Sequence, residues 1–187
     1  MVMHDAIDET QVGQIPTGEA FRQRFGNPYA VIHRVDVHQS LLEGAQESGR
    51  VEFHTRARVE NIEQAADREP IDNWTFGRAT LLGDAAHPTT QYMAQGACMA
   101  IENAVTLGEA LRVNGNDSAR AFALYQRSRI ARTARIVLSS REMGRIYHAK
   151  GVERLVRNDL WRGRSPERFY DAMEWLYGWN VGNCLAK

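Results

Sequence analysis

Apolar residues recur at helical spacing through most of the second half of the chain, which predicts a largely helical region there. The expected helices cover about Gln95–Arg112, Ser118–Tyr147, Val152–Leu160 and Pro166–Trp179. Pro166 suits the first helical position because its missing N–H would have no partner there, and Ser165 can cap the same helix. The run Asn114-Gly115-Asn116-Asp117 separates the first two helices.

The first half has a more broken pattern of apolar and polar positions. Turn-forming residues dominate the first 30 positions, so we expect short strands and loops there. A helix is expected over Asp36–Ser48, with Asp36 as its cap, followed by strand over about Val51–Ile62. Residues 63–73 are polar and contain a proline, which indicates a linker. The short apolar run Ala79–Leu82 predicts a buried parallel strand.

Composition excludes several classes of protein. The chain has 187 residues, enough for one domain with a sizeable core. Lys plus Arg and Asp plus Glu both total 23, so nothing in the net charge favours nucleic acid or an anionic membrane as a partner. The basic residues that cluster in one stretch are interpreted as a solvated helix face. They are Arg127, Arg129, Arg132, Arg135, Arg141 and Arg145.

Targeting and redox signals point to the cytoplasm. No apolar run approaches the ~18 residues that a membrane span needs. The N-terminus carries Asp5, Asp8 and Glu9, where a signal peptide would be basic and then apolar. Cys98 and Cys184 form neither a disulfide framework nor a metal-ligand spacing, so no metal site is expected.

One segment, RATLLGDAAHPTTQYMAQGACMAIENA from Arg78 to Ala104, carries specific chemistry. Gly83 would let a ligand approach the backbone, and Asp84 would offer a carboxylate to polyol hydroxyls. Free N–H groups around Gln95, Gly96 and Ala97 would suit an anionic ring edge or phosphate at the helix start.

Two other interpretations of this segment stay open on local grounds. Asp84 can cap a turn in an ordinary connection between a strand and a helix. Asp84 and His87 can also be half of a metal site, although no third ligand stands nearby in the sequence.

GDAAHP, followed by Gln-Gly-Ala and Ala-Ile-Glu, resembles the second FAD-binding motif of the class A FAD-dependent aromatic hydroxylases. VIHRVDVHQSLL resembles the arginine-plus-helix segment of that family, and ARVENIE resembles its stretch near the adenine. The resemblance implies cofactor contacts at Arg34, Val59, Gly83, Asp84, Gln95, Gly96 and Ala97. It also implies FAD as cofactor, NADH or NADPH as electron donor, and a small aromatic acid as substrate.

QYMAQGACMA and the C-terminal SSREMGRIYHAKGVERLVRNDLW are similar to the members that hydroxylate 3-hydroxybenzoate to gentisate. In these members a Gln at the position of Gln91 faces the substrate, so Gln91 is the expected catalytic and substrate contact. Tyr92 is a second substrate candidate, with packing as its alternative role. Asn103 stands where Asp is common in the family, which removes a charge. Salicylate is an alternative substrate.

Two motifs of the family do not occur in these residues. No two glycines stand two positions apart, so the GxGxxG phosphate cradle is absent, and no Asp-Gly dipeptide occurs. We therefore expect weak FAD binding or none, with a non-catalytic remnant or helical interaction module as the alternative function. Exposed strand edges should favour a homo-oligomer.

The expected fold class is α/β, a remnant of a doubly wound (Rossmann-like) flavin-binding hydroxylase fold with a mostly helical C-terminal half. The expected division has three segments: a partial FAD-domain segment (1–64), the second FAD-binding motif (65–115) and a C-terminal helical region (116–187).

Overall fold

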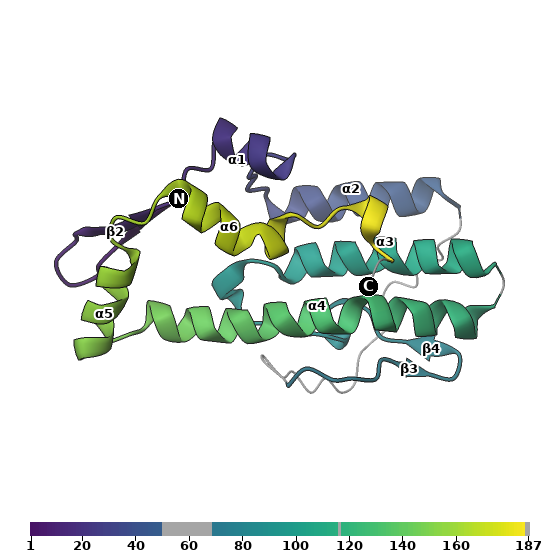
Figure 1. The fold of residues 1–187 in the computed structure, drawn as a ribbon. Coiled ribbons are helices and arrows are strands. Elements are labelled where there is room, and N and C mark those ends of the chain that lie inside the picture. The colour runs from purple at the N-terminus through teal and green to yellow at the C-terminus, as the bar shows by residue number, and fades with distance from the viewer. Residues whose placement is uncertain (50–68, 116, 186–187) are drawn as a thin grey trace. The chain divides into compact units, whose positions relative to one another are not determined.

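The computed structural model describes residues 1–49, 69–115 and 117–185. The chain divides into two compact units, one of residues 16–64 and the other of residues 1–15 with 65–187. The combination of helices and short strands agrees with the predicted α/β fold class (Figure 1). The strands predicted near 51–62, with Val59 among them, lie outside the described residues.

In the unit of residues 16–64, the described elements are α1 (Glu19–Phe25) and α2 (Arg34–Glu47). The prediction of strand and loop over the first 30 residues was wrong for α1. This helix is only seven residues long and is organised by Phe21, which is buried and contacts the rings of Phe25 and Tyr29 at 4.5 and 5.8 Å between centroids. The contact with Phe25 spans one helical turn and the contact with Tyr29 lies just beyond the helix, and seven residues show too little periodicity to predict them.

The start of α2 also differs from the expected one. His33 is its N-cap, and its side chain accepts a hydrogen bond from the N–H of Val35. The predicted cap, Asp36, lies inside the first turn, where a carboxylate favours the positive end of the helix dipole.

The other unit begins with an antiparallel hairpin, β1 (Val2–His4) paired with β2 (Gln11–Gln14). Asp5 follows β1 directly and is buried. Its carboxylate accepts hydrogen bonds from the side chain of Asn158 and from the N–H of Ile7, and it forms an ion pair with Arg154 at 2.6 Å. Asp5 therefore ties the hairpin to the helix that carries Asn158 and Arg154.

This anchor predicts acid sensitivity. The hydrogen bond from Asn158, followed by those from the N–H of Ile7 and from Arg154, holds the pKa of Asp5 below its ordinary value. A carboxylate with a lowered folded-state pKa contributes stability that is present above the unfolded pKa of about 4 and is lost as the pH falls further. We expect Asp5→Asn to flatten the decline of the melting temperature between about pH 4 and pH 2. Thermal melts across that range check this, and parallel curves for the two proteins would contradict it.

The segment before the candidate site forms a second small hairpin, β3 (Thr75–Phe76) with β4 (Ala79–Thr80). The two strands are antiparallel, so the predicted buried parallel strand over Ala79–Leu82 was wrong. Leu82 is 42% exposed. A four-residue apolar run is compatible with several environments, and here the tight turn through Gly77, at a φ of 60°, selects a local hairpin.

Helices fill the rest of this unit, as predicted. They are α3 (Gly96–Asn114), α4 (Ser118–Tyr147), α5 (Gly151–Trp161) and α6 (Pro166–Tyr177). Pro166 occupies the first turn of α6 and Ser165 caps it by accepting from the N–H of Arg168, which confirms the predicted start. The helix ends two residues before the predicted end.

The long helices α3 and α4 pack side by side (Figure 1). One core cluster lies around Trp74 and Tyr125, whose rings are 5.6 Å apart, with Ala86 and Ala110 beside them. A second cluster joins Met99, on α3, to Ile136 and Leu176. These two clusters hold the loop between β4 and α3 against the helix pair.

The interpretation of the basic stretch on α4 as a solvated face was wrong for Arg129, whose side chain is fully buried. Arg132 is also largely withdrawn from solvent, and Arg135 lies over the ring of Trp175 at 3.9 Å. Arg141 pairs with Glu69. Arginine buries readily where a carboxylate or an aromatic face accepts it, and sequence spacing alone does not reveal these partners.

Candidate functional site

The Gly83–Asp84 turn lies against the beginning of α3. It forms a short 3-10 turn, η1 (Gly83–Ala85), after β4. Gly83 is buried at a φ of 59°, a conformation that L side chains rarely adopt. A Cβ at this position would lie 3.6 Å from the Cβ of Ala100 in the second turn of α3. Glycine is therefore favoured here by the positive φ of the turn, since a Cβ would make only an ordinary contact with Ala100.

Asp84 is exposed, and its carboxylate accepts no hydrogen bond within the part of the chain that the structure describes. The alternative role of Asp84 as a turn cap required bonds to N–H groups of its own loop, and the structure contradicts it. Instead, the N–H groups of Ala86 and His87 donate to the carbonyl of Gly83, at 2.9 and 3.1 Å. The Asp84 carboxylate is thus left for solvent or a ligand.

The start of α3 leaves backbone donors open. The carbonyl of Gln95, the N-cap, accepts from the N–H of Met99 at 2.8 Å, but among the described residues no side chain caps the helix. The N–H groups of Gly96 and Ala97 precede the first N–H with an acceptor in the helix. A Cβ at Gly96 would lie 3.7 Å from Cγ2 of Thr89, so the loop folds back over the helix start, as predicted. That Asp84 and these N–H groups face one shared space stays a prediction.

The two predicted substrate residues belong to η2 (Gln91–Met93), a 3-10 turn that packs against α4. Gln91 is exposed, and its contact with a substrate stays a prediction. Tyr92 lies over the backbone of Gly144 and meets the rings of Tyr147 and His148 at 6.1 and 5.5 Å between centroids. The position of Tyr92 agrees with its alternative role in packing.

Hydrogen bonds fix the loop just before η2. The hydroxyl of Ser140 donates to the carbonyl of Thr90 at 2.8 Å, and the two hydroxyl oxygens lie 2.7 Å apart. Ala94, which ends η2, has a φ of 51°, a left-handed conformation that is strained for alanine. The contacts of Thr90 thus fix the loop four residues before Ala94, which precedes Gln95, the N-cap of α3.

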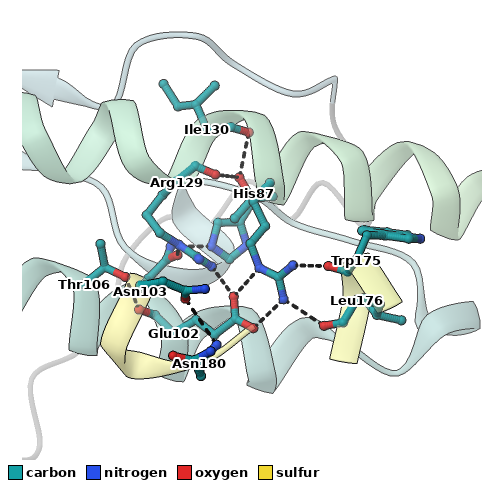
Figure 2. Close-up of polar contacts among 12 residues, drawn as sticks. His87, Glu102, Asn103, Thr106, Arg129, Ile130, Trp175, Leu176 and Asn180 are labelled. Carbon is teal, nitrogen blue, oxygen red and sulfur yellow. Dashed lines mark hydrogen bonds and ion pairs between the residues drawn. The ribbon is translucent and has the colours of Figure 1, made fainter. Parts of the chain in front are cut away.

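Behind the loop lies a buried polar network that was not predicted from the sequence (Figure 2). The carboxylate of Glu102 accepts from Arg129 at 2.6 Å and from two nitrogens of Arg132 at 2.8 Å. Arg132 also donates to the carbonyls of Trp175 and Leu176, at 2.6 and 2.9 Å. Glu102 therefore joins α3 to α4, and Arg132 extends the connection to the end of α6.

The network reaches the loop through Asn103, which lies between Arg129 and His87. Trp74 packs on His87, and its ring also contacts Tyr125. Burial raises the pKa of Tyr125 to about 12, and its hydroxyl donates to the carbonyl of Leu81. The sequence carries a partial signal for this network, since Glu102 stands three residues after Met99 and Arg129 four residues after Tyr125, at helical spacing from core positions.

Two predicted cofactor contacts, Arg34 and Val59, belong to the unit of residues 16–64. Arg34 begins α2 in this unit, so its role at a flavin stays a prediction, as does that of Val59. In the described ranges, His, Cys, Asp and Glu side chains nowhere gather in threes as a metal site would need. The helices of residues 1–49, 69–115 and 117–185 include none long and apolar enough to cross a bilayer.

Known proteins resemble this chain in sequence and in structure. Residues 66–140 match the FAD binding domain family. The 3-hydroxybenzoate 6-hydroxylase of Polaromonas naphthalenivorans is 49% identical over an alignment of 322 residues, which covers all of this chain and 80% of that protein. The 3-hydroxybenzoate 6-hydroxylase 2 of Aquipseudomonas alcaligenes is 80% identical over 122 residues, covering 65% of this chain and 38% of that protein.

A solved structure is also similar. Klebsiella pneumoniae HpxO, complexed with FAD and uric acid, superposes with a TM-score of 0.54 at 35% identity, covering 59% of this chain and 29% of that one. The alignment of 322 residues exceeds the 187 residues of this chain, so the Polaromonas relative has residues within the matched span that have no counterpart here.

Proposed function

The chain belongs to the class A FAD-dependent aromatic hydroxylases, and from that premise we propose that it acts on 3-hydroxybenzoate and forms gentisate. FAD would be its cofactor, NADH or NADPH the electron donor and O2 the second substrate. Two relatives named 3-hydroxybenzoate 6-hydroxylase support the proposal. They are 49% and 34% identical to this chain, and the alignments cover 80% and 81% of their lengths. Salicylate, another phenolic acid, is the alternative substrate.

The observation that carries the proposal is the open start of α3 beside the Gly83–Asp84 turn. In the described part of the chain, the N–H groups of Gly96 and Ala97 are uncapped and suit the electron-rich edge of a flavin ring, and the Asp84 carboxylate has no partner and suits ribityl hydroxyls. When bound, FAD would supply the electron transfer and oxygen chemistry. These residues would hold and orient it, and the amide of Gln91 would hydrogen-bond the aromatic acid.

Titration with FAD and a turnover assay test this proposal. Saturable quenching of flavin fluorescence, together with NADH or NADPH oxidation stimulated by 3-hydroxybenzoate and gentisate as product, is the expected result. Salicylate in place of 3-hydroxybenzoate compares the two substrates. Quenching without turnover would reject the activity but keep the cofactor site, whereas the absence of both would reject both.

Substitution of Asp84 isolates its predicted contact. We expect Asp84→Asn to weaken FAD binding about tenfold, because an amide replaces a charge-assisted hydrogen bond to the ribityl chain worth about 1.5 kcal/mol. Asp159→Asn, at an exposed carboxylate on α5, is the control that should leave the affinity unchanged. Equal FAD affinities for Asp84→Asn and the unsubstituted chain would remove Asp84 from the site.

The second candidate function is a non-catalytic module in which the C-terminal helices bind a partner. It is favoured by the absence of Gly-x-Gly and Asp-Gly from these 187 residues, because the family uses both motifs to hold its cofactors. We propose a cytoplasmic location and a homo-oligomer for either function. Light scattering measures the latter, and a monodisperse monomer would argue against it.

A further inference from the structure

Asn103 is fully buried between Arg129 and His87, and its orientation is determined by what its neighbours can donate or accept (Figure 2). The Nε of Arg129 lies 2.7 Å from Oδ1 of Asn103. A guanidinium nitrogen only donates, so the atom that faces it must be the amide oxygen. The amide nitrogen of Asn103 is then the atom that lies 2.6 Å from Nε2 of His87.

The amide nitrogen of Asn103 also determines which nitrogen of the His87 ring carries the proton. An amide NH2 group only donates, so Nε2 of His87 must accept and cannot carry a proton. In a neutral imidazole the single proton is then on Nδ1. In an imidazolium both nitrogens carry protons, and Nε2–H would meet another donor at 2.6 Å inside the protein.

We infer that Asn103, oriented by Arg129, holds His87 in its neutral form with the proton on Nδ1, so that this histidine does not act as a pH switch. Asn103 is then a positioning residue that acts through His87. The N–H of His87 donates to the carbonyl of Gly83, at 3.1 Å, so the same histidine belongs to the Gly83–Asp84 turn. The inference concerns the ring of His87 alone and does not depend on the proposed activity.

Burial and charge around His87 favour a neutral ring, and the buried Nδ1 that carries its proton has no hydrogen-bond partner among the described residues. The side chain is 3% exposed, and burial, followed by the positive charge of Arg129, lowers the pKa of His87. The interaction of the ring with the backbone of His87 itself, and then the charges of Asp84 and Glu102, act in the opposite direction on this pKa. Two guanidinium groups, those of Arg129 and Arg132, already compensate Glu102, which limits its effect on the imidazole.

Nitrogen and carbon NMR shifts of the histidine rings in the native protein test the inference directly. The chain has six histidines, and a His87→Gln variant identifies the signal of this one by its loss. The expected result is the Nδ1–H tautomer with no titration from pH 5 to pH 8, whereas an ordinary histidine titrates near pH 6.5. An Nε2–H signal, or titration of His87 in that range while the protein stays folded, would overturn the inference.

An Asn103→Asp variant supplies the complementary test. A carboxylate accepts from Nε2–H, so the pKa of His87 should rise by at least about one. The new ion pair contributes its whole stabilisation below the unfolded-state pKa of His87, and this contribution is lost as the pH rises through the raised folded-state pKa. The melting temperature of the variant should therefore show a new decline above about pH 7.

Asn114→Asp adds the same charge at the end of the same helix, away from His87, and should leave the His87 signal unchanged. A folded Asn103→Asp protein with an unshifted His87 signal would contradict the proposed contact. If this variant does not fold, the tautomer measured in the native protein still decides the question.

Discussion

Replacement of Glu102 by Gln is expected to lower the free energy of unfolding by about 3–5 kcal/mol, because two guanidinium groups then lose their carboxylate inside the protein. Arg129 is fully buried and Arg132 nearly so, and both contact Glu102 at hydrogen-bonding distance. Because Arg129 is buried, water cannot solvate its uncompensated positive charge. Chemical denaturation monitored by circular dichroism gives the free energy.

The matched control for this substitution is Glu109→Gln on the same helix. Glu109 pairs with Arg112, which is largely exposed, and such surface pairs contribute about 0–1 kcal/mol. The change should therefore cost far less than Glu102→Gln. Equal losses for the two variants would show that Glu102 contributes no more than an exposed carboxylate.

A methyl group at position 144 is expected to be the second most damaging of the changes considered. In Gly144→Ala the new Cβ would lie 2.5 Å from Cε2 of Tyr92, closer than any real contact. The ring is held by Tyr147 and His148, so it must shift, at a cost of about 1–3 kcal/mol. The free energy of unfolding measures this effect.

Gly108→Ala is the control, since nothing lies within 4 Å of a Cβ at that helical position. Alanine should stabilise α3 there by about 0.5–1 kcal/mol. A double variant with Tyr92→Ala distinguishes a local clash from a general effect. Its free energy of unfolding should be little lower than that of Tyr92→Ala alone, because the clashing ring is gone. A full loss in the double variant would contradict the proposed clash.

The sequence predicted those parts of the fold that depend on local chemistry. Ser165 and Pro166 mark the start of α6 because capping and a fixed φ are properties of a few neighbouring residues. Long apolar periodicity likewise located α3 and α4 to within about two residues. At the candidate site, the Gly-Asp turn and the loop folded back over the start of α3 followed from short-range sequence.

The remaining features depend on residues far apart in the sequence. Arg129 is buried because Glu102, 27 positions away, faces it across two packed helices. Ala79 pairs with Phe76 in a hairpin although its apolar run is equally typical of a parallel strand. The packing of Tyr92 likewise depends on Gly144, a residue whose lack of a side chain gives no signal in a hydrophobic pattern.

The hydrogen bonds that Arg132 donates to the carbonyls of Trp175 and Leu176 have a consequence for local unfolding. The end of α6 can separate from α4 only if those bonds break, and Arg132 is itself held by the carboxylate that joins α3 to α4. Opening of α3 or α4 near this carboxylate separates Glu102 from its arginines and leaves their charges unpaired, whereas opening of α6 removes two carbonyl acceptors from Arg132. Local openings there should be coupled, so that backbone amides of α3, α4 and the last turn of α6 exchange with solvent as one cooperative unit.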